Sequence, residues 1–87
     1  MTRQLFDPVL AREDIREKIV GLARGRVAVR KVSDDELIHE TGLLDSAAIM
    51  ELVMWLETRF DISIDQADLT IENLGSVNAM VDYLERQ

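Results

Sequence analysis

Residues 46–60 carry apolar side chains at the spacing of an α-helix, and this segment limits the folds that the chain can adopt. At about 100° per residue, five of these side chains fall within one third of the helix circumference and predict a core-facing side. The five are Ile49, Leu52, Val53, Leu56 and Phe60. Other sides carry Ala47, Met50, Met54 and Trp55. A helix that is apolar on most sides is typical of a large interior or a membrane, yet an 87-residue chain can bury only one modest core.

Three other segments have residues typical of the first or last positions of helices. Asp7 and Pro8 can begin one that ends at Gly25, since proline lacks only an N–H that the first turn leaves unpaired. Thr70 can cap a very short helix. Ser76 can cap the last one, where apolar residues follow at i, i+3, i+4 and i+7. These residues are Val77, Met80, Val81 and Leu84.

A long connection over residues 26–45 separates the first two helices, and Asp45 can cap the second. Within this connection Val27, Val29 and Val32 indicate an extended piece. The chain is therefore predicted to be all-α: a small four-helix bundle of three main helices and one short one, with a long loop between the first two. Residues 1–87 are expected to form a single domain and a monomer.

Charge is divided unevenly along the chain. Residues 1–31 hold eight Lys or Arg against four Asp or Glu, whereas residues 32–87 hold two against thirteen. The strongly negative C-terminal part argues against nucleic acid as a partner and favours basic protein surfaces. Arg24, Arg26, Arg30 and Lys31 form the one basic stretch, which we interpret as a solvated loop near a helix end.

Several classes of site and location are excluded by composition. The chain has no cysteine and a single histidine, His39, so disulfides, thiolate metal sites and multi-histidine zinc sites cannot form. No metal site is predicted. Residues 1–10 contain no apolar signal-peptide core, and no run approaches the roughly 18 apolar residues that span a bilayer. We therefore expect a cytoplasmic protein without membrane insertion.

The second apolar side of the 46–60 helix favours a surface for partner proteins. Methionine is flexible and polarizable, which suits an adaptable contact. We predict a partner-binding face from Ala47, Met50, Glu51 and Met54, whose acidic border with Asp45 and Glu57 would attract basic partners. Trp55 has two open interpretations, a partner contact or packing beneath the 26–45 loop.

Ser46 follows the capping residue Asp45 and so occupies the first helical position. The first N–H groups of a helix are unpaired and its dipole is positive there, which would favour a phosphate group on this hydroxyl. Taken alone, a serine at a helix start is more often a simple cap.

The surrounding sequence resembles acyl and peptidyl carrier proteins, which carry phosphopantetheine. The likeness extends over nearly the whole chain and includes a first helix followed by a long loop. Its residues are Leu43-Leu44-Asp45-Ser46, Ile49, Glu51-Leu52-Val53, Leu56-Glu57, Phe60 and Ile62, then Ser76-Val77 and Tyr83-Leu84.

This resemblance implies that Ser46 carries a 4′-phosphopantetheine arm, placed there by a phosphopantetheinyl transferase from coenzyme A with Mg²⁺, and that Asp45 assists the metal during modification. The arm ends in a thiol that holds acyl or aminoacyl groups as thioesters.

Further implied partners are a loading ligase, adenylation enzyme or acyltransferase and a downstream synthase or transferase. Partner recognition falls on Ala47, Met50, Glu51 and Met54. The pathway would make fatty acids, polyketides or nonribosomal peptides. Ala47 departs from the family, which usually has leucine or another large apolar residue there, and we expect this smaller contact to narrow or change the set of partner enzymes.

Two alternatives belong to other functional classes. The first is a hydrolase that uses Ser46 and His39 with a carboxylate. The sequence has no Gly-x-Ser-x-Gly turn to present the serine, and the chain is too small to enclose a substrate. A helical adaptor that is never modified would use the same apolar face to bind a partner. Modification by coenzyme A and a transferase distinguishes the adaptor from the carrier.

Overall fold

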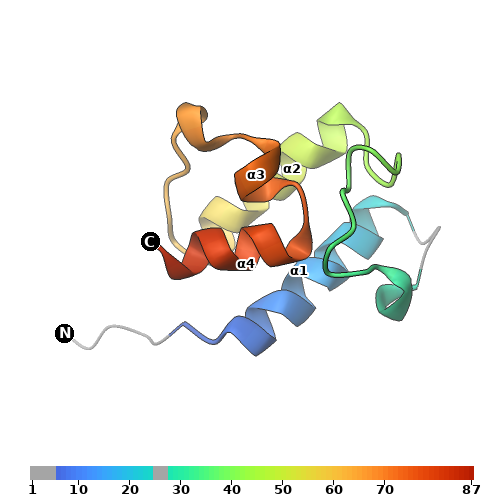
Figure 1. Cartoon of the computed structure of the whole chain (residues 1–87), viewed down its shortest axis with the longest axis horizontal. Helices are drawn as coiled ribbons and strands as arrows, with labels where there is room; N and C mark the ends of the chain where they lie inside the picture. Colours follow the sequence, from blue (N-terminus) through green and yellow to red (C-terminus); the bar gives the residue numbers. More distant parts are fainter. Residues whose placement is uncertain (1–5, 25–27) are drawn as a thin grey trace.

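The computed structural model describes residues 6–24 and 28–87, and within these ranges the chain is all-helical (Figure 1). Its elements are α1 (Pro8–Leu22), η1 (Val29–Lys31), α2 (Ser46–Arg59), η2 (Gln66–Asp68), α3 (Ile71–Leu74) and α4 (Val77–Glu85), where η marks a 3₁₀ turn. Helix α4 packs on both α1 and α3, and α1 also packs on α2. The predicted fold class, three main helices and one short helix, is confirmed.

Helix starts follow the capping chemistry that the sequence indicates. Asp45 Oδ1 accepts a hydrogen bond from the Ala48 N–H at 2.8 Å, and Ser76 Oγ accepts one from the Ala79 N–H at 3.1 Å. The side chains of Asp7 and Thr70 cap α1 and α3 in the same way. Each cap satisfies an N–H that the first turn leaves unpaired and stabilises its helix by about 1 kcal/mol.

Two local predictions in the first half of the chain agree only in part with the described residues. Helix α1 ends at Leu22, and Arg24 beyond it adopts a left-handed conformation with φ 59°; the predicted stop at Gly25 lies outside the described residues. Val29 begins the 3₁₀ turn η1, whereas Val32 after it is extended as predicted, with φ −90° and ψ 106°. Val27 also lies outside the described residues.

The core is built from the buried sides of α1, α2 and α4. Its largest fully buried side chains are Ile15, Ile19, Leu52, Leu56, Val77, Met80 and Val81. The long connection is fixed to this core by Val32, Ile38 and Leu44, all buried. The Ile38 N–H also donates to the Gly75 carbonyl at 3.0 Å, which joins the connection to the turn between α3 and α4.

Polar contacts add a second attachment for the connection. Asp34 accepts a hydrogen bond from Arg16 at 3.1 Å and forms an ion pair with Arg12 at 3.5 Å, so two residues of α1 hold it. The Asn78 N–H at the start of α4 donates to the Asp34 carbonyl at 2.9 Å. The connection is therefore ordered by contacts with α1 and α4, although its described part, residues 28–45, contains only one 3₁₀ turn.

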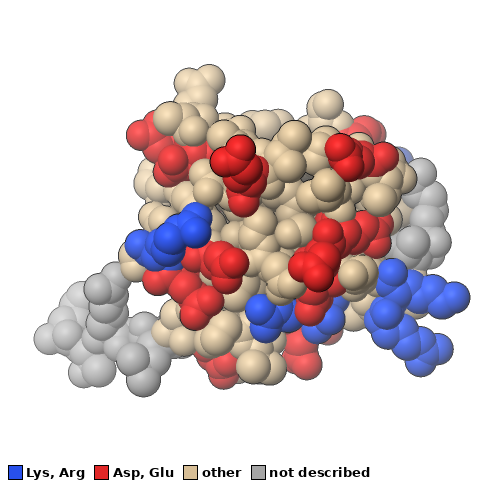
Figure 2. All heavy atoms as spheres, in the orientation of Figure 1, with Lys and Arg blue, Asp and Glu red and all other residues tan. Residues whose placement is uncertain are grey.

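On the visible surface acidic side chains outnumber basic ones, which lie at the lower centre, the right-hand edge and one place on the left (Figure 2). Arg24, Arg30 and Lys31 are all exposed, as expected for a solvated basic stretch, and Arg26 is not described. Among the described helices, none has both the length and the apolar character needed to cross a bilayer.

Candidate functional site

Ser46 is the first residue of α2, and its side chain is exposed to solvent. Asp45 precedes it in an extended conformation, and the Asp45 carboxylate accepts a hydrogen bond from the Ala48 N–H three residues later. Within the described residues, the N–H groups of Ser46 and Ala47 donate to no protein acceptor. The serine hydroxyl is thus accessible beside two unpaired backbone donors.

This arrangement fits an anionic group attached to the serine oxygen. The aligned peptide dipoles of the 14-residue helix α2 give its N-terminus a partial positive charge. Unpaired N–H groups at a helix start can hydrogen-bond the oxygens of a phosphate. Ser46 and the first turn of α2 would hold a phosphodiester, while Asp45 keeps the helix start in place.

The predicted partner face lies open on α2. Met50 and Met54 are 49% and 62% exposed, and Ala47 and Glu51 are exposed as well. These four residues lie on the same side of the helix as Ser46 or next to it, since residues three and four apart are neighbours. The structure therefore leaves an apolar strip with an acidic residue at its edge next to the serine.

Trp55 and Glu57 differ from the exposed residues of this face. The Trp55 ring is half-buried against the core and meets Phe60 edge-on, with centroids 5.9 Å apart. Its ring partner is therefore at the end of α2, not in the 26–45 connection, and its role in partner binding stays a prediction. Glu57 accepts a hydrogen bond from the Ile64 N–H at 2.9 Å, so this carboxylate holds the chain after α2 and is only partly available to a partner.

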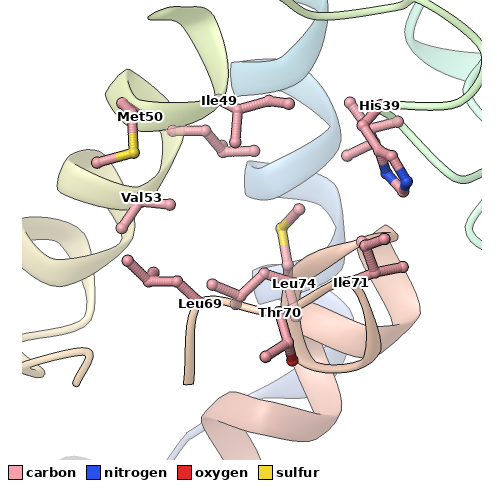
Figure 3. A pocket seen from close by; sticks show the side chains of 12 residues that line it. His39, Ile49, Met50, Val53, Leu69, Thr70, Ile71 and Leu74 are labelled. Carbon is pink, nitrogen blue, oxygen red and sulfur yellow. The ribbon is translucent and has the colours of Figure 1, made fainter. Parts of the chain in front are cut away.

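An apolar cavity of about 270 Å³ opens beside Met50, between α2 and the segment that contains α3 (Figure 3). Its α2 side consists of Ile49, Met50, Leu52 and Val53. Its other residues are Ile38, His39, Leu69, Thr70, Ile71, Leu74, Gly75 and Met80. Met50 lies one helical turn after Ser46, so a group attached to the serine starts close to the mouth of this cavity.

The sequence did not reveal the cavity, because its two sides are far apart along the chain. One signal was available. Leu69 and Ile71 place large apolar side chains in a short polar segment, and both remain exposed at 37% and 55%. Apolar side chains without a buried partner in such a segment can indicate a binding groove.

His39 lines the cavity but does not form a catalytic pair with Ser46. In the part of the chain that the structure describes, no hydrogen bond joins the two side chains. No three His, Cys, Asp or Glu residues of that part come close enough to hold a metal ion.

Comparison with known proteins identifies the family. Residues 15–84 match the family described as "Phosphopantetheine attachment site". The chain belongs to the phosphopantetheine-binding carrier proteins. The carrier is 34% identical over 70 residues to a D-alanyl carrier protein of Streptococcus uberis, covering 78% of this chain and 87% of that protein.

Two acyl carrier proteins are also similar to it. The carrier is 30% identical over 80 residues to the acyl carrier protein of Thermotoga maritima, covering 88% of this chain and 95% of that protein. It is 39% identical over 75 residues to the acyl carrier protein of Exiguobacterium sibiricum, covering 86% and 85% of the two chains.

Membership of this family establishes the general role of the carrier. It holds covalently attached 4′-phosphopantetheine and is a carrier rather than an enzyme. The bound group supplies the thiol that this cysteine-free chain lacks. Transferases and ligases are its partners in general terms.

Proposed function

We propose that Ser46 carries the 4′-phosphopantetheine arm and that Asp45 assists Mg²⁺ while a transferase attaches it. One observation supports this assignment above the others: the Ser46 hydroxyl is exposed at the start of α2, beside two N–H groups with no protein acceptor in the described residues. A transferase can reach this oxygen without unfolding the chain. The attached phosphate meets the favourable end of the helix dipole.

Intact-mass spectrometry tests the assignment. The apo protein is incubated with coenzyme A, Mg²⁺ and a broad-specificity phosphopantetheinyl transferase, and it should gain one phosphopantetheinyl group. Ser46→Ala should gain none. Ser63→Ala is the matched control, since Ser63 is also exposed, and it should be modified like the wild type. Equal modification of Ser46→Ala would show that another residue carries the arm, and no modification of the wild type would favour the adaptor.

Ala47, Met50, Glu51 and Met54 are proposed to form the surface on which the transferase and the cargo-loading enzymes bind. The exposed methionines provide apolar contact area, and Glu51 lies at its edge. A basic region around an enzyme's active-site entrance would complement this surface and speed the encounter at low salt. Ala47 adds little contact area, so partners that require a large side chain at this position would bind weakly.

The cargo that the cavity supports best is an acyl chain. The cavity is lined almost entirely by apolar side chains and opens beside Met50. Each methylene of an acyl chain buried there would stabilise the form with the chain inside the cavity by about 0.8 kcal/mol. Relatives include both acyl and D-alanyl carrier proteins, and a D-alanyl group offers too little apolar surface to use such a cavity. We therefore favour acyl-chain synthesis of the fatty-acid or polyketide type over aminoacyl transfer.

Hydrogen exchange of loaded proteins separates the two kinds of cargo. Octanoyl loading should slow amide exchange in residues 69–75 relative to the unloaded carrier, because the chain fills the space against this segment. D-alanyl loading should leave exchange there unchanged. Equal exchange in the octanoyl and D-alanyl forms would contradict the acyl-chain assignment. The proposed setting is the cytoplasm, where the monomeric carrier serves separate loading and synthase enzymes.

A further inference from the structure

The cavity has one wall that could change position. Residues 65–75, which include η2 and α3, form this wall and contribute Leu69, Thr70, Ile71 and Leu74 to the lining (Figure 3). The opposite side is α2, a 14-residue helix that contributes three residues to the core. The width of the cavity therefore depends on where the 65–75 wall is held.

This wall has few apolar contacts of its own to fix it. Helix α3 has only four residues and none of them is buried. A single helical turn is not stable by itself, because the entropy lost in ordering its backbone exceeds the stabilisation from its one or two hydrogen bonds. No hydrogen bond joins the wall to α2 within the described residues. Its position must come from contacts with other elements.

Helix α4 supplies most of these contacts. The Tyr83 hydroxyl donates to Asp68 Oδ2 at 2.8 Å, and the Tyr83 side chain is buried. Asn73 links the same parts, since its Nδ2 donates to the Asp68 carbonyl at 3.1 Å and its Oδ1 accepts from Arg86 at 3.1 Å. The last turns of α4 thus hold the wall near both of its ends.

We propose that Tyr83 is a positioning residue: through Asp68 it holds the 65–75 wall against α4 and so keeps open the cavity that receives the cargo. This inference rests on the proposed function of the cavity. Tyr83 does not line the cavity and touches no cargo, so its effect on the cargo must pass through Asp68 and the wall. Losing the hydroxyl removes this link while the Asn73–Arg86 and Ile38–Gly75 hydrogen bonds remain, so the wall is held less firmly relative to α2.

The first measurement needs no cargo. In apo Tyr83→Phe, hydrogen exchange at the Leu74 and Gly75 amides should rise about two- to tenfold, the factor that one hydrogen bond contributes. The Leu74 N–H donates to the Thr70 carbonyl at 2.9 Å and the Gly75 N–H to the Ile71 carbonyl at 2.8 Å, both inside the wall. Exchange in the core of α1 should stay at the wild-type rate. Wild-type exchange throughout the wall of Tyr83→Phe would overturn the proposal.

The second measurement uses thioester cleavage by hydroxylamine in the full chain loaded with octanoyl or acetyl groups. In the wild type, the octanoyl thioester should be cleaved more slowly than the acetyl thioester. In Tyr83→Phe, octanoyl cleavage should speed up about two- to tenfold while acetyl cleavage stays unchanged. Thr58→Val is the matched control, because it removes a hydroxyl that donates to the Met54 carbonyl in α2, outside the wall.

Variants of Asp68 provide an independent check. Asp68→Asn keeps an oxygen that can accept from Tyr83 and should behave as the wild type, whereas Asp68→Ala should reproduce Tyr83→Phe. Octanoyl protection that survives in both Tyr83→Phe and Asp68→Ala would overturn the positioning role. Equal cleavage of octanoyl and acetyl thioesters in the wild type would instead refute the cavity as the cargo site, and the exchange data would still decide whether Tyr83 holds the wall.

Discussion

Gly75 joins α3 to α4, and the preceding turn passes so close to it that a methyl group does not fit. A Cβ built on Gly75 would collide with the Ile71 carbonyl oxygen and lie 2.9 Å from Ile71 Cγ2. The carbonyl belongs to the backbone and cannot rotate away, so Gly75→Ala must displace the chain. The Gly75 carbonyl also accepts the hydrogen bond from Ile38, and a displaced backbone would weaken this link.

The expected cost follows from that collision. Overpacking a well-filled site costs about 1–3 kcal/mol. Each kcal/mol lowers the melting temperature of a domain of this size by roughly 4–8 °C. At a cost of about 2 kcal/mol, Gly75→Ala should melt roughly 8–16 °C below the wild type when unfolding is followed by circular dichroism.

Gly21→Ala is the matched control for this prediction. Gly21 lies in α1 with no atom within 4 Å of the position where a Cβ would stand. Alanine in a helix is more favourable than glycine by about 0.5–1 kcal/mol, so Gly21→Ala should melt roughly 2–8 °C above the wild type. A melting temperature of Gly75→Ala at or above that of the wild type would refute the close-approach argument.

Three further outcomes can be measured. Met50→Glu should lower kcat/KM for the transferase about tenfold, as expected when a central contact is lost, whereas Val9→Glu on exposed α1 surface should not. Asp45→Asn should keep the helix cap, with a free energy of unfolding within about 1 kcal/mol of the wild type, yet slow modification because it removes the carboxylate that we propose assists Mg²⁺. Burial first, and then the hydrogen bond with Asp68, raise the pKa of Tyr83 above its ordinary value of 10.0. The unfolded chain therefore loses this proton first, and stability measured by urea unfolding should fall as the pH rises above 10.0, with no such fall from this group in Tyr83→Phe.

The helices could be predicted because their starting signals are local. A side chain at Asp45 or Ser76 acts on an N–H two or three residues later, so the sequence alone contains both partners. The apolar stripe of α4 was also sufficient to predict which of its residues face the core, since Met80, Val81 and Leu84 are all buried as its spacing indicates.

Features that join distant segments could not be predicted. The cavity requires residues 38–39 and 69–75 to face α2, and no periodicity records that arrangement. The bond from the Ile64 N–H to Glu57 turned an expected surface carboxylate into a structural one. The valine spacing also did not indicate that Val29 begins a 3₁₀ turn while Val32 is extended. The functional roles of Ser46 and its neighbours remain predictions that the experiments above address.

The edge-on contact between Trp55 and Phe60 gives the molecule a built-in optical reporter. Trp55 is the only tryptophan of the chain, so its emission comes from a single known environment beside Phe60 at the end of α2. It lies nine residues after Ser46, about 13 Å along the helix axis. Fluorescence should therefore follow global unfolding closely and change little when the serine is modified, which allows stability to be compared between the apo and loaded forms without any added dye.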